Sequence, residues 1–168
     1  MRALQATARS GGYEMHITAA VDKVNDRQKT VMLPRIVKHF GDQLAGKTIA
    51  VWGLAFKPKT DDMREAPSIP LIESLLQAGA TVQVYDPEAM GVAKKLFGNR
   101  VTYADANYTA LKGADGLAIV TEWNEFRRPD FERMRTLMKT PVIFDGRNLF
   151  VPAQMKQSGF TYYSIGRR

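Results

Sequence analysis

The segment Ile49–Ser68, IAVWGLAFKPKTDDMREAPS, predicts a strand, then a loop, then the start of a helix. Its first residues form an apolar, β-branched run that is typical of a buried strand. The loop after this strand, Ala55–Pro67, is long, because roughly 2–6 residues usually join a strand to a helix. Ser68 favours a helix N-cap, and a helix N-terminus beside Lys57 attracts anions. We therefore expect this segment to hold a phosphate-bearing ligand.

The pattern of strand followed by helix continues from residue 46 to residue 168. Strands are predicted at 48–54, 81–85, 101–103, 116–121, 142–144 and, as an edge strand, 162–165. Helices are predicted at 68–78, 88–97, 106–112, 131–138 and 152–157. Such alternation implies right-handed crossovers and a parallel sheet with helices on both faces. The predicted fold class is therefore α/β, a Rossmann-like doubly wound parallel sheet.

Residues 1–42 show a helical pattern throughout, so a long helical segment precedes the sheet. It begins with a short helix at 1–9 and continues with a helix from about 15 to 40, which Pro34 is expected to kink. A helix of ~25 residues spans about 37 Å, which is longer than the core of one small domain needs. Two interpretations stay open: a helix that packs on its own domain, or a connector or homodimer interface. We divide the chain into a helical dimerisation segment, 1–42, and a ligand-binding domain, 43–168.

The chain of 168 residues carries a formal net charge of +7, which favours anionic partners. Its basic residues are scattered and accompany no nucleic-acid-binding motif, so we expect no nucleic acid partner. No apolar run approaches the ~20 residues of a membrane helix, so we expect no membrane partner. The absence of cysteine excludes a thiolate nucleophile within this sequence and agrees with a cytoplasmic location. No metal site is expected, because the two histidines are far apart and have no cysteine or carboxylate cluster beside them.

The loops after the first and fifth predicted strands carry the candidate ligand-binding cations. Ligands of open α/β sheets bind beyond the carboxyl ends of the strands, where the strand order reverses. Lys57 comes after the first strand, and Arg147 comes after the fifth, so the two cations would suit a diphosphate. Of the G-x-G-x-x-G fingerprint of dinucleotide-binding domains only Gly53 remains, so the backbone alone encodes no pyrophosphate cradle. The alternative, a charged surface loop with internal ion pairs, has about equal weight.

Two further strand ends carry residues that could contact a ligand. Asp86 ends the second predicted strand, where the acid of a dinucleotide-binding domain would grip a ribose. Because Pro87 comes next and the glycine fingerprint is absent, we favour a turn residue. Trp123 and Phe126, after the fourth strand, are expected to cap the core rather than to form a ligand platform.

Five segments of the chain carry a family resemblance. They are VDKVNDRQK (Val21–Lys29), GLAFKPKTDDMREAPS (Gly53–Ser68), VYDPEAM (Val84–Met90), TEWNEF (Thr121–Phe126) and IFDGRNLF (Ile143–Phe150), with YYSIGR near the end. In this order, and over essentially the whole chain, they resemble the UDP-glucose/GDP-mannose dehydrogenase family. The TEW and FKP forms point towards UDP-glucose rather than GDP-mannose or a UDP-N-acetylhexosamine.

The resemblance implies an enzyme of three parts: an N-terminal NAD domain, a long central helix at the dimer core and a C-terminal UDP-binding domain. Such enzymes oxidise a sugar CH2OH to a carboxylate in two successive NAD-dependent steps, through a thiohemiacetal on cysteine. By position, Phe56, Lys57 and Arg147 match residues that contact the UDP-sugar. Arg64 matches an arginine that reaches NAD bound to the other domain. The implied ligand and cofactor are therefore a UDP-sugar and NAD.

The sequence departs from the family in one large respect. The family's nucleophilic cysteine lies in a segment G-x-x-G-S-C-F-P-K-D, and Met1–Leu4 resembles the residues directly after that segment. The cysteine and the NAD domain are therefore absent, and we expect the chain to bind the UDP moiety without oxidising it, because a covalent thiol mechanism needs its thiolate. Three alternatives stay open: a stand-alone, non-catalytic nucleotide-sugar-binding module, a dehydrogenase specific for another nucleotide sugar, and an unrelated Rossmann-like domain that binds a dinucleotide.

Overall fold

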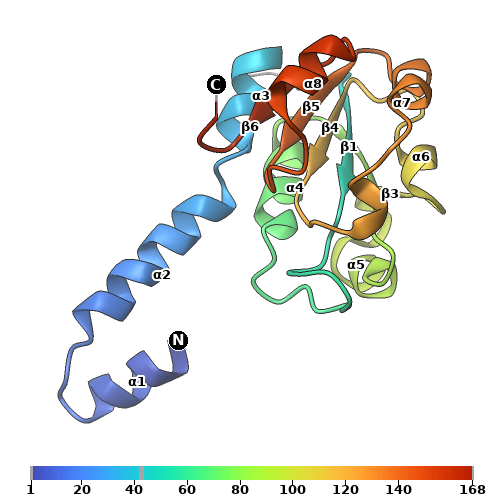
Figure 1. Ribbon diagram of the computed structural model, residues 1–168. Coiled ribbons are helices and arrows are strands. Elements are labelled where there is room, and N and C mark those ends of the chain that lie inside the picture. The colour runs from blue at the N-terminus through green and yellow to red at the C-terminus, as the bar shows by residue number, and fades with distance from the viewer. Residues whose placement is uncertain (1, 42–43, 168) are drawn as a thin grey trace.

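The structure, a computed structural model, describes residues 2–41 and 44–167. Figure 1 shows an α/β domain from which two helices, α1 (Arg2–Ser10) and α2 (His16–Lys29), extend as an arm. The predicted boundary between the helical segment and the ligand-binding domain falls at 42–43, outside the described residues. Met1 of the first predicted helix lies outside them as well.

Within the described residues, six strands form one parallel sheet, as the alternating pattern predicted. They are β1 (Thr48–Trp52), β2 (Thr81–Tyr85), β3 (Thr102–Tyr103), β4 (Gly116–Ile119), β5 (Val142–Asp145) and β6 (Thr161–Ser164). The strand order is β3-β2-β1-β4-β5-β6, and every neighbouring pair is parallel. The chain crosses to the other half of the sheet between β3 and β4, so the switch point lies between the carboxyl ends of β1 and β4. The predicted doubly wound, Rossmann-like fold class is confirmed.

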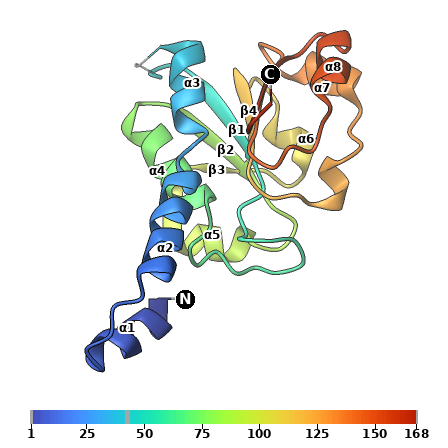
Figure 2. The same ribbon diagram turned by 60° about the vertical axis from the view of Figure 1, so that its left-hand side comes forward.

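The helices cover both faces of this sheet (Figure 2). The first face carries α3 (Leu33–Phe40), α4 (Ser68–Gln77) and α5 (Met90–Phe97), and the second carries α6 (Asn107–Ala110), α7 (Phe131–Leu137) and α8 (Pro152–Gln157). Along β1, Ile49 and Val51 enter the core under the first group of helices, whereas Ala50 and Trp52 enter the core under the second. This part of β1 is apolar without interruption because both of its faces are buried.

The predicted helix from 15 to 40 is two helices in the structure. α2 ends at Lys29, a turn comes next, and α3 begins at Leu33. Pro34 is the second residue of α3, where a missing N–H costs little because the first N–H groups of a helix have no partner within it. The interruption therefore lies one turn before Pro34 rather than at it. Pro34 cannot donate to the carbonyl of Thr30, and its ring would clash with that carbonyl in a continuous helix.

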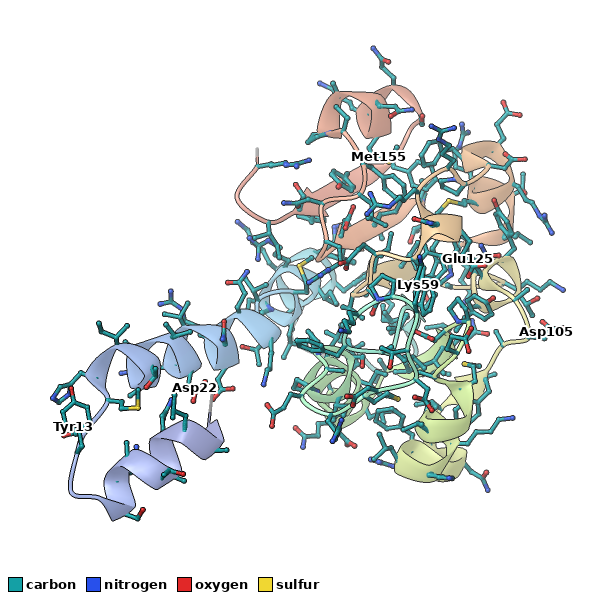
Figure 3. All side chains as sticks on the ribbon, turned by 60° about the horizontal axis from the view of Figure 1, so that its bottom comes forward. Tyr13, Asp22, Lys59, Asp105, Glu125 and Met155 are labelled. Carbon is teal, nitrogen blue, oxygen red and sulfur yellow. The ribbon has the colours of Figure 1, made fainter. Side chains whose placement is uncertain are left out.

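The arm is a helical hairpin. α1 folds back along α2, and the side-chain amide of Gln5 donates to the carboxylate of Asp22 at 2.7 Å. Figure 3 shows Asp22 between the two helices and Tyr13 at the turn that joins them, away from the α/β domain. In that turn Gly12 adopts the left-handed conformation, with φ at 74°, as expected of a glycine that stops a helix. No residue of α2 is buried, and Ile17 is 82% exposed, so the arm presents apolar surface to solvent.

Candidate ligand-binding site

A cavity of about 650 Å³ lies at the carboxyl ends of the central strands. Val120, directly after β4, and Gly146, directly after β5, line it from the sheet. Phe56 lines it from the β1–α4 loop, which spans Gly53–Pro67, and the phenyl side chain is half exposed. The cavity therefore lies at the edge of the sheet where doubly wound folds bind ligands.

Asp86 fixes the start of the β1–α4 loop from the end of β2. The side chain is buried, and its carboxylate accepts five hydrogen bonds from protein donors. The donors are the backbone N–H groups of Leu54 (2.7 Å), Ala55 (3.1 Å), Glu88 (2.9 Å) and Ala89 (2.8 Å) and the indole Nε1 of Trp123 (3.0 Å). A carboxylate offers about four lone-pair sites, so Asp86 has no capacity left for a ribose hydroxyl. The turn role that we favoured is confirmed, whereas the bonds to Leu54 and Trp123 were not predicted.

Two hydroxyl groups hold the carbonyl groups at the start of the same loop. Thr121 donates from Oγ1 to the carbonyl of Ala55, and Ser68 donates from Oγ to the carbonyl of Leu54, each at 2.6 Å. Ser68 is thus the first residue of α4 and not its N-cap, because its hydroxyl is turned back to β1. Gly53 permits this close packing: its φ is 88°, and a Cβ at this position would lie 2.5 Å from the Cβ of Thr121.

Asp145 and Asn148 fix the loop that carries Arg147. Asp145 is fully buried, and its carboxylate accepts from the backbone N–H of Arg147 at 2.9 Å and from the hydroxyl of Tyr162 at 2.8 Å. Burial raises the pKa of Tyr162 well above its usual range, so this hydroxyl stays protonated and donates. The carboxamide of Asn148 bonds both the N–H and the C=O of Ile165, at 2.9 and 3.0 Å. The backbone beside Arg147 is therefore fastened to the C-terminal segment.

The guanidinium of Arg147 forms an ion pair with Glu122. Its Nε donates to the Glu122 carboxylate, and this hydrogen bond holds the pKa of that carboxyl below its usual range. The two side chains are 36% and 27% exposed. Arg147 lines the cavity, whereas Glu122 does not. The pairing was not predicted, although TEWNEF and DGRNLF lie directly after neighbouring strands.

Lys57 and Arg64 lie on the β1–α4 loop outside this cavity. Lys57 is exposed and adjoins Phe56, but it is not among the residues that line the cavity. Arg64 is 90% exposed and forms a forked pair with Asp62, from Nε at 3.0 Å and Nη2 at 2.8 Å. The hydrogen bond from Arg64 lowers the pKa of Asp62 to about 2. Arg64 also lines a second, shallower cavity of about 380 Å³. The structure thus places Phe56 and Arg147 in the lining of one cavity, whereas Lys57 and Arg64 do not line it.

The arm forms the remaining wall of the main cavity. The α2 residues in this wall are Asp22, Asn25, Asp26, Gln28 and Lys29. Lys29 pairs with Glu65 of the β1–α4 loop, and the hydrogen bond that Lys29 donates to the Glu65 carboxylate raises the pKa of Lys29. The lining residues of charged type are Lys29 and Arg147, which are basic, and Asp22, Asp26 and Glu65, which are acidic. An anionic ligand is therefore attracted locally, at individual donors, rather than by a uniformly positive cavity.

Across the residues that the structure describes, no three histidine or carboxylate side chains gather in a way that could hold a metal ion. Over the same residues, no helix has the length and apolar character needed to cross a membrane.

Comparisons with known proteins find that the chain is similar to parts of nucleotide-sugar dehydrogenases. The family model described as UDP-glucose/GDP-mannose dehydrogenase family, UDP binding domain, matches residues 50–152. The chain is 46% identical to UDP-glucose 6-dehydrogenase of Pseudomonas aeruginosa, over 99% of the chain and 38% of that protein. It is similar to the structure of a UDP-glucose dehydrogenase from Pyrobaculum islandicum, with a TM-score of 0.79, 32% identity and coverage of 96% and 34%.

A second structure is similar to the same extent. An NDP-N-acetyl-D-galactosaminuronic acid dehydrogenase from Methanosarcina mazei matches with a TM-score of 0.80 and 26% identity, over 98% of this chain and 36% of that one. The chain therefore spans between 34% and 38% of the length of these three proteins.

Proposed function

Because the chain belongs to the UDP-glucose/GDP-mannose dehydrogenase family and contains its UDP-binding domain, we propose that it is the UDP-sugar-binding part of a UDP-glucose 6-dehydrogenase. The observation that carries this proposal is the cavity at the carboxyl edge of the sheet, lined by Phe56 and Arg147. The 46% identity to a UDP-glucose 6-dehydrogenase over nearly the whole chain supports glucose as the sugar. The reaction of the whole enzyme would convert UDP-glucose to UDP-glucuronate with two NAD.

Three residues are proposed to contact the UDP-sugar. Arg147 donates to a phosphate oxygen, because a guanidinium matches the geometry of phosphate and lines the cavity. The half-exposed ring of Phe56 supplies an apolar surface for the ribose or the base. Lys57, exposed on the same loop, reaches towards the diphosphate as a mobile point charge. The cysteine that would form the covalent intermediate is absent from this chain, so its own residues bind and orient the substrate.

NAD is proposed to bind mainly outside this domain. The carboxylate of Asp86 is saturated by protein donors, and the space at Gly53 is filled by Thr121, so this sheet edge does not fit a dinucleotide. Arg64 is the residue of this chain that we propose to reach NAD held by another domain. Its 90% exposure leaves it accessible from outside.

A homodimer formed through the helical region predicted at 15–40 is also proposed. Ile17, Val21 and Val24 of α2 are exposed although they are apolar, and a second copy would cover them. Sedimentation at micromolar concentration tests this proposal, since a clean monomer would contradict it. A cytoplasmic location stays a prediction from the cysteine-free composition.

Calorimetric titration with UDP, ADP and CMP tests the proposed function. UDP should bind more tightly than the other two nucleotides, and equal affinity for all three, or no binding of UDP, would contradict the proposal. The similarity to the Methanosarcina mazei enzyme favours another nucleotide sugar as the second candidate. A comparison of UDP-glucose with UDP-N-acetylgalactosamine separates these two substrates.

A further inference from the structure

Glu122 lies between two residues that hydrogen bonds hold in place. Its neighbour Thr121 is fully buried and donates to the carbonyl of Ala55, and its other neighbour Trp123 donates from the indole to Asp86. Both flanking residues are therefore fixed by hydrogen bonds to the loops around the cavity. Because Thr121 and Trp123 are fixed, the position of the Glu122 backbone between them is fixed as well.

The backbone of Arg147 is held in the same way, because its N–H donates to Asp145 and the side chain of the next residue, Asn148, bonds the backbone of Ile165. These backbone bonds do not determine the direction of the long, flexible side chain of Arg147. Holding such a side chain in one rotamer costs conformational entropy, which a ligand must otherwise supply on binding. The hydrogen bond from Nε to Glu122 restricts these torsions before a ligand arrives.

The hydrogen bond to Glu122 leaves most donors of the Arg147 guanidinium for a ligand. A guanidinium has five N–H donors. Within residues 2–41 and 44–167, the side chain of Arg147 donates one hydrogen bond, from Nε to the carboxylate of Glu122. The four donors on the two Nη atoms therefore remain for a ligand. Since Arg147 lines the cavity and Glu122 does not, the carboxylate holds the guanidinium from outside the cavity.

We propose that Glu122 is a positioning residue, which orients Arg147 so that its Nη donors meet the phosphate groups of the bound UDP-sugar. This inference rests on the proposed function. Because the Glu122 carboxylate balances the charge of Arg147, the pair offers directed hydrogen bonds rather than net positive charge.

The test is a set of titrations with UDP and with uridine, which carries no phosphate. Glu122→Ala should weaken UDP binding about three- to tenfold, the usual effect of one lost hydrogen bond. Glu122→Gln should stay within about twofold of the wild type, because the amide oxygen still accepts from Nε. Neither variant should change uridine binding. Glu88→Ala, which removes the same charge from an exposed side chain, should match the wild type.

A double mutant decides whether Glu122 acts through Arg147. Arg147→Ala and the combined Glu122→Ala, Arg147→Ala variant should bind UDP equally weakly. Additive losses, or a Glu122→Ala variant that binds UDP like the wild type while Arg147→Ala does not, would overturn the inference alone. No binding of UDP to the wild type would overturn the proposed function, and the inference with it.

A measurement without ligand guards against misfolded variants. NMR hydrogen exchange of the Arg147 Nε–H should be slow in the wild type and fast in Glu122→Ala, with backbone signals otherwise unchanged. Equal exchange in both proteins would contradict the positioning role.

Discussion

Replacing Asp86 with asparagine tests whether one buried carboxylate holds the loops of the binding site in place. Asparagine has the same shape, but one oxygen becomes an NH2 group that cannot accept. If the NH2 takes the place of Oδ1, it faces the N–H groups of Glu88 and Ala89; at Oδ2 it faces three donors, from Leu54, Ala55 and Trp123. In the first orientation one buried donor, the N–H of Ala89, and the part-buried N–H of Glu88 are left without an acceptor; in the second, three buried donors are.

The expected cost is set by that count. A buried donor without a partner costs about 1–3 kcal/mol, so Asp86→Asn should lower the free energy of unfolding by at least about 1–3 kcal/mol. This is a large part of the roughly 5–15 kcal/mol by which a domain is stable. UDP binding should weaken as well, because the bonds to Leu54 and Ala55 fix the loop that carries Phe56.

Urea unfolding monitored by circular dichroism measures the change in stability. Glu14→Gln, at an exposed carboxylate in the turn between α1 and α2, is the control and should change stability by less than about 0.5 kcal/mol. A loss below about 1 kcal/mol for Asp86→Asn, with UDP binding unchanged, would refute the assignment of Asp86 as the residue that fixes these loops.

Three other predictions concern the same loop. Gly53→Ala should lower the free energy of unfolding by about 2–4 kcal/mol, because its Cβ would lie 2.5 Å from the Cβ of Thr121 in a left-handed backbone; unfolding at the wild-type urea midpoint would contradict this. Lys57→Ala should weaken UDP binding by ~1.5–3 kcal/mol, the effect of a lost charge-assisted contact, and an unchanged Kd would remove Lys57 from the site. Asp62 should titrate by NMR with a pKa of about 2 and return towards 3.8 in Arg64→Ala. Since the folded-state pKa is lowered, the stabilisation by this pair is present above pH 3.8 and lost as the pH falls towards 2, and a wild-type midpoint near 3.8 would rule the pair out in solution.

The sheet could be predicted because each of its strands has a sequence pattern that does not depend on distant residues. The run from Ile49 to Trp52 is apolar on both faces of the strand, and each later strand is bounded by turn residues, so the alternation was visible without any tertiary contact. The break before Pro34 was misplaced because the prediction weighed the proline at its own position. The proline instead excludes a helical bond to the residue one turn earlier, which ends α2 there.

The cavity could be predicted only in part. The length and charge of the β1–α4 loop marked it as a site, but the partners that shape it are distant in sequence. Asp86 and Trp123 are 37 positions apart and Lys29 and Glu65 are 36 apart, and the residue types alone do not say that either pair meets. Asp86 was therefore identified as a turn residue, while its part in holding the loop of another strand could not be inferred.

The wall that α2 contributes to the cavity has a thermodynamic consequence. The arm is tied to the loop at Lys29 and Glu65, so a ligand that touches both sides binds more tightly while they are held together. Linkage is reciprocal, and occupancy must then favour the docked arm by the same factor. In the proposed homodimer, a second copy that holds α2 in the docked position would raise the affinity for the ligand without touching it, and a saturating ligand would tighten that dimer in return.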